Sequence, residues 1–440
     1  MALYDTCFSA LTLINSYLEF PALILFLGTG VFLTLKTGFI QIRAFPRFIA
    51  LLTQGVRHGE SSRIKTINPF HALLSAMATT IGMGNIVGPS MAIAIGGPGA
   101  LLWLLVYIFF GSVTKFTEVT FSVFARKITP AGDVMGGPAQ YLKLVSPKLA
   151  AWYAGLTIFL FTGWSGIQVN TLASIWAQEG ISRWITGLVA VAILLAVVLG
   201  GVKRIGFFAS RIVPLKFLVY ITFVLIILFQ HPAALWVSIK LVFSSAFHPP
   251  AALGGFAGAT LLSCLREGIY KGIFITESGV GTASIAHALS DAKNPVDQGI
   301  LAMFSGIADM FLCTLSGLLT LVTGVWLSGK LNNTLVYEAF KSYFPVNGGQ
   351  YILVVAILLF VITALIGNTF NGSQSFASLT GYKYVSAYYF MAALIAFLGA
   401  LADVPFLWKI MDVVLVLVAI PNLMGIIYLS FSHAHVVKIK

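Results

Sequence analysis

Residues 82–89 read Gly-Met-Gly-Asn-Ile-Val-Gly-Pro and stand inside an apolar segment that is long enough to cross a bilayer. Three glycines and a proline within eight residues interrupt a helix, because glycine loses much backbone entropy and proline lacks an N–H donor. About 195 residues later, a second apolar segment carries Thr-Glu-Ser-Gly-Val-Gly-Thr at 276–282. In lipid, the freed peptide groups must be buried in protein or face a wet cavity. We therefore expect two interrupted membrane-spanning helices with a polar site at their breaks; a kink packed against neighbouring helices is the alternative.

The composition identifies lipid as the solvent of this chain. Of its 440 residues, 58% are hydrophobic and only 9% are charged, against roughly 25% charged residues in soluble domains. This excludes a soluble enzyme, a secreted disulfide scaffold and a disordered chain, and the long continuous apolar runs argue against a β-barrel. The net charge of +12 lies in short loops without a basic face, so we expect no nucleic-acid partner. The three cysteines are scattered, and we expect no transition-metal site.

Windows of about 20 residues predict an all-α polytopic membrane protein with about eleven transmembrane helices. The candidate spans lie near residues 16–36, 68–95, 98–125, 149–177, 184–200, 207–229, 255–288, 297–328, 348–371, 384–402 and 406–431. With the N-terminus outside, the inward loops carry 17 Lys and Arg residues and the outward loops carry 5. The positive-inside rule therefore predicts an odd number of spans and a cytoplasmic C-terminus.

Each interrupted segment begins a run of five spans. Without the first helix, spans two to six and seven to eleven form two groups of five. Because five is an odd number, the second group has the opposite orientation in the membrane. Interrupted segments at corresponding positions of two inverted halves are the best sequence signal for the binding site of a secondary transporter. Half-helix N-termini offer N–H groups to a carboxylate, and half-helix C-termini offer carbonyls to an ammonium group or Na⁺. The predicted segments are 1–66 (N-terminal helix and basic cytoplasmic loop), 67–230 (first repeat), 231–253 (outer loop or interfacial helix), 254–432 (second, inverted repeat) and 433–440 (tail).

Several motifs, in their order, resemble the alanine or glycine:cation symporter family along nearly the whole chain. Gly82–Gly88 followed by Gly96–Ala100 looks like the family's GTGNIxG…GGPGA segment, and Lys271–Gly279 looks like its RGxFSNEAG segment. Further fragments in register are Gln168 with Asn170, the stretch from Gly200 to Pro214, and Asp412 with Ile420–Leu423. The resemblance implies a LeuT-like five-plus-five inverted repeat after one additional N-terminal helix. It also implies a sodium-coupled symporter that imports a small neutral amino acid across the bacterial inner membrane by alternating access, without a cofactor and with the N-terminus in the periplasm.

The breaks and the resemblance together indicate where the substrate binds. The expected contacts on the interrupted segments are Gly82, Met83, Gly84, Asn85, Phe274, Thr276 and Gly279. Gln168 on a following span has an amide that can donate two hydrogen bonds to a carboxylate; an interhelical hydrogen bond is the alternative. Asn170 points elsewhere on the same helix and is expected to be structural.

A sodium site is implied by the resemblance, since LeuT-like carriers hold Na⁺ between first-repeat carbonyls and hydroxyls of the second repeat. By position, the expected ligands are Thr79, Thr80, Gly82 and Thr363. Hard cations prefer such oxygen ligands. The alternative for Thr363 is a hydroxyl that bonds a carbonyl of its own helix.

Five charged residues within or near spans are candidates for gating or charge balance: Lys115, Glu118, Lys271, Glu277 and Asp309. A carboxylate in mid-span is a functional hypothesis by default, although Glu277 as a cap or clamp on the broken helix is the alternative. Glu118 follows Lys115 by three residues on one helix face, which favours an ion pair between them. Asp309 is the candidate partner of a proton or cation, and Lys271 is expected to balance Glu277.

The chain departs from the family pattern at Met83, Ile275, Thr276 and Asn368, all near the expected pocket. Cation-coupled transport is therefore better supported than alanine or glycine as the solute. The first rival is proton coupling through Asp309, Glu277 or a histidine. A channel or an intramembrane enzyme is disfavoured because neither a filter repeat nor a catalytic pair is present. The expected partners are thus a small neutral amino acid, Na⁺ and the lipid bilayer, and the sequence predicts no particular oligomeric state.

Overall fold

The structure is a computed structural model that describes residues 2–54, 66–130, 132–248, 261–328, 334–343, 349–402 and 404–438. These residues are mostly helical, as expected. Within them, the single sheet is an antiparallel ribbon of two short strands, β1 (Lys127–Ile128) and β2 (Val134–Met135).

The helices follow one another along the whole chain. Their bounds are α1 Ala2–Lys36, α2 Ile40–Arg43, α3 Phe45–Gln54, α4 Pro69–Thr80, α5 Met83–Gly96, α6 Ala100–Ala125, α7 Pro138–Tyr141, α8 Pro147–Gln178, α9 Arg183–Val198, α10 Gly201–Gln230, α11 Pro232–Phe247, α12 Leu261–Thr276, α13 Thr282–His287, α14 Pro295–Val322, α15 Leu335–Tyr343, α16 Gly349–Thr380, α17 Val385–Leu401 and α18 Val404–Ser432. Short 3₁₀ helices lie at η1 Leu142–Leu144, η2 Val325–Ser328, η3 Tyr382–Tyr384 and η4 Ala434–Val437.

Seven helices of the described chain are long and apolar enough to cross a membrane, namely α1, α6, α10, α14, α16, α17 and α18. The pair α4 and α5, bent by 44°, adds an eighth if it counts as one span. Helices α8, α9 and α12 coincide with further expected spans but are not both long and apolar enough by the same test. Eleven spans in two inverted groups of five therefore remain a prediction. Residues 255–260, the start of the expected seventh span, lie outside the described residues.

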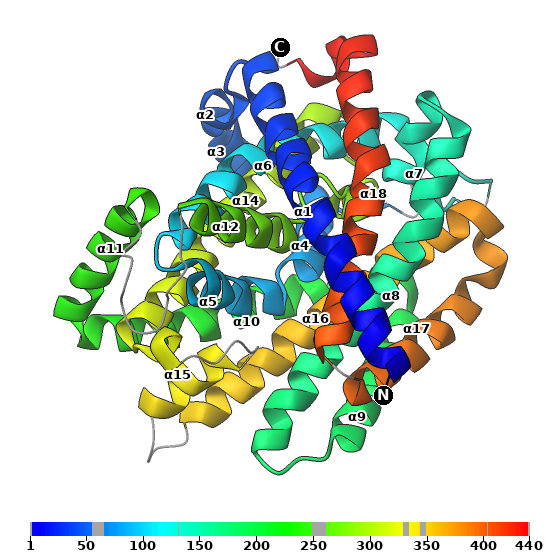
Figure 1. Ribbon diagram of the computed structural model, residues 1–440. Coiled ribbons are helices and arrows are strands. Elements are labelled where there is room, and N and C mark those ends of the chain that lie inside the picture. The colour runs from blue at the N-terminus through cyan, green and yellow to red at the C-terminus, as the bar shows by residue number, and fades with distance from the viewer. Residues whose placement is uncertain are drawn as a thin grey trace.

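The helices form one bundle in which α1 crosses the front beside α18 (Figure 1). Helix α8 packs against α16, α17 and α18, while α6 packs against α12 and α14. The N and C marks lie toward opposite ends of α1 in this view. The broken helices are thereby enclosed, since α5 packs on α12 and α14, and α4 packs on α10, α13 and α16.

The first break lies at Gly82, the first of the three glycines expected to interrupt the helix, whereas Gly84, Gly88 and Pro89 lie inside α5. Helix α4 begins with Pro69 after Asn68, whose side chain accepts a hydrogen bond from Phe70 N at 2.8 Å. It ends at Thr80, and α5 starts after Gly82. Asn85 N donates to Gly82 O at 3.3 Å rather than to the carbonyl of Ile81 four residues back. The break therefore frees the Ile81 carbonyl for another donor.

The second break, between α12 and α13, contains three residues with left-handed backbone. They are Glu277, Gly279 and Gly281, with φ of 54°, 97° and 85°. Two of these positions are glycines, which adopt such angles without a steric penalty. Buried tyrosines satisfy the freed carbonyls, because Tyr107 donates to Ser278 O and Tyr153 donates to Val280 O, each at 2.8 Å.

Within the segment 231–253, which the sequence left as an outer loop or an interfacial helix, the described residues 232–247 form a helix, α11. Its Trp236, Phe243 and Phe247 are exposed, and it lies at the left edge of Figure 1. An interfacial position for α11 remains a prediction, as do the segment boundaries proposed from the sequence. Residues 249–253, and residues 55–65 of the basic loop, are outside the described part of the chain.

Candidate functional site

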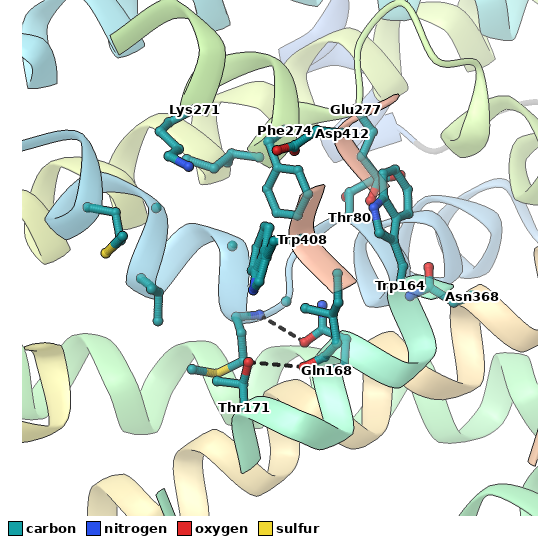
Figure 2. Close-up of a pocket in the computed structure, with 18 of the residues that line it drawn as sticks. Thr80, Trp164, Gln168, Thr171, Lys271, Phe274, Glu277, Asn368, Trp408 and Asp412 are labelled. Carbon is teal, nitrogen blue, oxygen red and sulfur yellow. Dashed lines mark hydrogen bonds between the residues drawn. The ribbon is translucent and has the colours of Figure 1, made fainter. Parts of the chain in front are cut away.

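A cavity of about 460 Å³ lies at the first break. Figure 2 shows Phe274 and Trp408 beside each other, with Lys271 to one side and Gln168 below. The lining residues are Thr79, Thr80, Gly82, Met83, Gly84, Val87, Gly88, Met91, Trp164, Ile167, Gln168, Thr171, Lys271, Phe274, Ile275, Glu277, Asn368, Trp408, Lys409 and Asp412. They come from α4, α5, α8, α12, α16 and α18 and, for Gly82 and Glu277, from the two breaks. A cavity of this volume is in the range of small-molecule sites.

The structure brings many of the predicted residues to this cavity and leaves others away from it. Those that line it are Thr79, Thr80, Gly82, Met83, Gly84, Gln168, Lys271, Phe274 and Glu277. Those that are not among its lining residues are Asn85, Thr276, Gly279, Lys115, Glu118, Asp309 and Thr363. The residues of the second set have polar partners outside the cavity lining: Asn85 and Lys115 contact Asp309, Glu118 contacts Gly279, Thr363 contacts Lys216, and Thr276 bonds its own helix.

Gln168 contacts the broken backbone directly. Its Oε1 accepts a hydrogen bond from Met83 N at 3.4 Å. A Cβ atom on Gly82 would lie 2.8 Å from Gln168 Nε2, so glycine permits the close approach. Gln168 therefore makes the interhelical hydrogen bond that the sequence left as an alternative, while it also lines the cavity. Asn170 instead donates to Gly399 O and Ala402 O at 2.6 and 2.9 Å, which confirms its structural role.

An aromatic group forms the apolar part of the cavity. The ring centroids of Phe274 and Trp408 lie 4.8 Å apart, and those of Phe274 and Trp164 lie 5.9 Å apart. Lys271 Nζ lies 5.8 Å from the Trp408 ring centroid. Trp164 and Trp408 could not be predicted from the sequence, because an isolated tryptophan in an apolar helix has no distinguishing pattern.

Charges of both signs reach the cavity. Lys271 and Glu277 come from α12 and its break, whereas Lys409 and Asp412 come from α18. A zwitterionic ligand carries both signs as well, so such a lining suits it.

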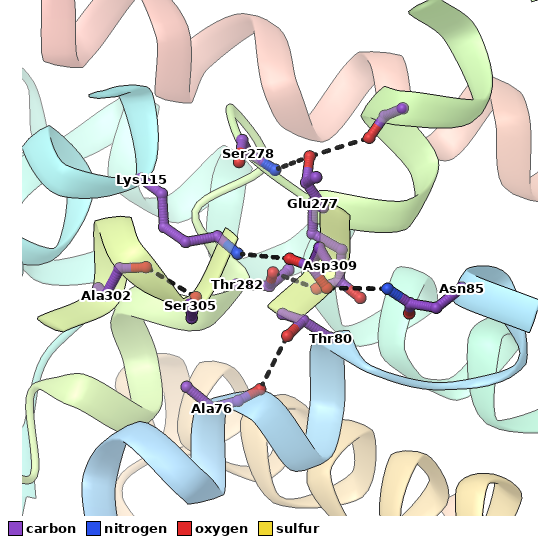
Figure 3. A network of polar contacts seen from close by, with 12 residues as sticks. Ala76, Thr80, Asn85, Lys115, Glu277, Ser278, Thr282, Ala302, Ser305 and Asp309 are labelled. Atoms are coloured by element: carbon purple, nitrogen blue, oxygen red, sulfur yellow. Dashed lines mark hydrogen bonds and ion pairs between the residues drawn. The ribbon is translucent and has the colours of Figure 1, made fainter. Parts of the chain in front are cut away.

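Asp309 is the centre of the first polar cluster. Its Oδ1 accepts a hydrogen bond from Asn85 Nδ2 at 2.8 Å, and its Oδ2 lies 3.6 Å from Lys115 Nζ. Figure 3 shows Lys115 and Asn85 approaching Asp309 from opposite sides. Lys115 is thus paired with Asp309 on the neighbouring helix α14 and not with Glu118, which lies three residues away on its own helix.

Glu118 binds the second break. Its Oε1 accepts hydrogen bonds from Gly279 N at 2.9 Å and from Asn422 Nδ2 at 2.6 Å. Asn422 also donates to Gly279 O at 2.8 Å, so both peptide groups of this glycine are satisfied. Gly279 therefore contacts the protein's own polar groups and is not among the residues that line the cavity.

The residues beside Gly279 have local partners too. Glu277 Oε2 accepts a hydrogen bond from the Thr282 hydroxyl, which is the clamp on the broken helix that the sequence left open, and Glu277 also lines the cavity. Thr276 Oγ1 donates to Gly272 O at 2.9 Å and accepts from Ser278 N at 3.3 Å.

Thr363, one of the residues expected to bind Na⁺, accepts a hydrogen bond from a lysine. Lys216 Nζ, on α10, donates to Thr363 Oγ1 at 2.7 Å and to Ile81 O at 2.5 Å. Thr363 Oγ1 in turn donates to Leu359 O of its own helix at 2.8 Å. Lys216 was not among the residues predicted from the sequence; its position in the middle of a span was the signal that could have found it. Across the described residues, no group of three or more His, Cys, Asp or Glu side chains could hold a metal ion.

Comparison with known proteins identifies the family of this chain. The model of the sodium:alanine symporter family matches residues 5–439. An uncharacterized transporter of Haemophilus influenzae is 35% identical, with 95% of this chain and 93% of that protein covered. The sodium/alanine symporter AgcS of Methanococcus maripaludis is 33% identical, over 96% of this chain and 94% of AgcS. The probable sodium/glutamine symporter GlnT of Bacillus subtilis is 31% identical, over 93% and 85%.

Two solved structures have the same fold at low sequence identity. One is a Na⁺-coupled sialic acid symporter in a substrate-bound outward-open state, with a TM-score of 0.56 and 13% identity over 88% of this chain and 82% of that one. The other is MhsT in complex with L-phenylalanine, with a TM-score of 0.58 and 15% identity over 84% and 90%. These likenesses support the LeuT-like fold expected from the sequence. Because the family model covers nearly the whole sequence, this chain belongs to the sodium:alanine symporter family.

Proposed function

We propose that this chain imports a small neutral amino acid together with a cation, by alternating access. The observation that carries the proposal is the cavity at the first break, where backbone N–H groups, an amide, aromatic rings and charges of both signs meet. The family consists of transporters, so the expectation that the chain is not an enzyme is confirmed.

The start of α5 is the proposed position of the substrate carboxylate. The first N–H groups of a helix have no partner within the helix and carry partial positive charge. Met83 and Gly84 lie there and line the cavity, and Gln168 already accepts from Met83 N. A carboxylate that displaces the Gln168 oxygen would receive this N–H, while the Gln168 NH₂ group becomes a second donor.

The aromatic group sets the proposed size of the substrate side chain. Phe274 and Trp408 occupy the space opposite Gln168 (Figure 2), so a small apolar side chain packs there without rearrangement. The relatives are named for alanine and for glutamine. We therefore propose that the substrate is a small neutral amino acid. Uptake measurements with a panel of amino acids distinguish among the members of this class.

Na⁺ is the first candidate for the coupling ion, because the family is the sodium:alanine symporter family and the relative AgcS is a sodium/alanine symporter. Thr79, Thr80, Gly82 and Thr363 are the positions that the fold family suggests for it. H⁺ is the second candidate, since Lys216 already binds Thr363 and a buried carboxylate, Asp309, lies in a cluster with Lys115. The proposed location is the bacterial inner membrane, with the N-terminus in the periplasm and the C-terminus in the cytoplasm.

Uptake by proteoliposomes tests the proposal. Purified protein is reconstituted, and a panel of labelled amino acids is offered under an imposed Na⁺ gradient at equal pH, or under an imposed pH gradient without Na⁺. Saturable accumulation above the external concentration under either gradient supports symport and identifies the ion. Gradient-independent equilibration of many solutes would instead identify a channel, and the absence of uptake for all amino acids would refute the proposal.

A further inference from the structure

Lys216 is a fully buried lysine in the middle of the long apolar helix α10, with 0% of its side chain exposed. A charged side chain within a membrane-spanning helix is costly, so it is found mainly where it has a binding partner or a function. In the proposed function, Lys216 enters only as a group that already binds Thr363.

The ammonium group bridges three elements. It donates to the Ile81 carbonyl in the break between α4 and α5, and to the Thr363 hydroxyl on α16. It also lies 4.9 Å from the centroid of the Phe360 ring, one turn before Thr363. The Ile81 carbonyl is the one that the break frees, because Asn85 N donates to Gly82 O instead. Lys216 therefore satisfies a carbonyl that would otherwise stand unpaired.

A carbonyl from a broken helix and a hydroxyl from a facing helix are the oxygen ligands that a hard monovalent cation takes. The same two kinds of oxygen bind the lysine here. An ammonium group and a Na⁺ ion cannot share them, because two positive charges at contact distance in a buried site repel each other strongly.

We propose that the Lys216 ammonium is a tethered cation that occupies the position between the α4–α5 break and Thr363, so that this chain binds no Na⁺ there. The inference rests on cation-coupled transport as the proposed function, and it restricts where the coupling ion acts. A tethered cation links α4, α10 and α16 permanently and does not leave with the substrate. An ion that drives transport must therefore bind at another position.

Sodium binding to purified protein tests this inference without knowledge of the substrate. The measurement is the Na⁺ concentration dependence of the thermal unfolding midpoint in detergent, with choline as the ionic-strength control, for four chains: native, Thr363→Ala, Lys216→Ala, and the double variant. The matched control for the hydroxyl is Ser375→Ala, a buried α16 serine that donates to its own helix at Asn371 O. The matched control for the charge is Lys203→Ala near the start of α10.

In the native background, Thr363→Ala and Ser375→Ala should have the same apparent Na⁺ affinity as the native chain, within about twofold. In Lys216→Ala, the unfolding midpoint should rise with Na⁺ but not with choline. In the double variant Lys216→Ala/Thr363→Ala, the apparent Na⁺ affinity of this new response should be at least tenfold lower. Lys203→Ala should show no new Na⁺ response.

Two results would overturn the inference. The first is a tenfold loss of Na⁺ affinity on Thr363→Ala alone, which would mean that Na⁺ already uses this hydroxyl. The second is a folded Lys216→Ala protein without a new Na⁺ response. If Lys216→Ala does not fold, the comparison of Thr363→Ala with the native chain still decides. Failure of amino-acid uptake would count against the proposed function only, because this measurement contains no substrate.

Discussion

Asn85 Nδ2 lies 2.8 Å from Asp309 Oδ1, so the first turn of α5 is bound to a carboxylate on α14. Lys115 on α6 lies 3.6 Å from the second oxygen of the same carboxylate. All three side chains are buried. Because α5 begins at the break, this cluster holds the helix end whose N–H groups face the cavity, and it does so from outside the cavity.

Asp309→Asn should destabilise the protein strongly, because Lys115 then remains buried without its partner. Removal of one member of a buried ion pair costs about 3–5 kcal/mol. The free energy of unfolding in a mild detergent measures the effect. Lys115→Met added to Asp309→Asn should recover part of the loss, since it removes the unpaired charge.

The control for this prediction is Asp297→Asn, which breaks the partly exposed pair with Arg47 at 2.7 Å. Exposed pairs contribute only about 0–1 kcal/mol. Equal effects of Asp297→Asn and Asp309→Asn would contradict the role given to the buried cluster.

Glu118→Ala should reduce uptake more than Glu118→Gln. The carboxylate accepts hydrogen bonds from Gly279 N and Asn422, and the glutamine retains one acceptor oxygen for them whereas alanine retains none. Each buried donor left unpaired costs about 1–3 kcal/mol, so uptake by Glu118→Ala should fall at least about tenfold. Initial uptake rates, normalised to protein in the membrane, measure the difference, and equal rates for both variants would show that Glu118 has no such role.

Gln168→Ala should raise the KM of substrate uptake and leave the folded protein close to native stability. The residue contacts Met83 N at the proposed carboxylate position, and a hydrogen bond contributes about 0.5–1.5 kcal/mol, or about a 2- to 10-fold change in KM. Asn170→Ala, two residues away, should lower the stability and leave the KM unchanged, because it removes the side-chain hydrogen bonds to Gly399 O and Ala402 O. A native KM in Gln168→Ala would remove it from the binding site.

Trp408→Leu should broaden the range of substrates toward larger side chains. Trp408 packs against Phe274 with ring centroids 4.8 Å apart, and a smaller residue enlarges the apolar part of the cavity. Competition of unlabelled amino acids against the preferred substrate measures the range. Trp184→Leu, at an exposed tryptophan on α9, is the control and should leave the ranking unchanged. An unchanged ranking in Trp408→Leu would show that the aromatic group does not select the substrate.

The local chemistry of the chain was sufficient to predict the mostly helical membrane fold and both breaks. Gly82 lies at the first break, because a glycine-rich stretch weakens a helix through neighbouring residues alone, whereas Gly84, Gly88 and Pro89 lie inside α5. At the second break, Gly279 and Gly281 adopt left-handed backbone, which requires no partner elsewhere in the chain. Residues next to these breaks, such as Met83 and Phe274, could therefore be assigned to the cavity from the sequence.

Tertiary structure alone decided which buried charges meet. Lys115 had a plausible partner three residues away in Glu118, yet it pairs with Asp309, and Glu118 binds the backbone of Gly279. Lys216 reaches Thr363 across 147 positions of sequence. Helical periodicity specifies which face of a helix a side chain occupies, but the neighbour on that face depends on how whole helices pack. For that reason the sequence by itself determined where the helices break, and the packing of α10 against α4 and α16 determined which positive charge lies at the break.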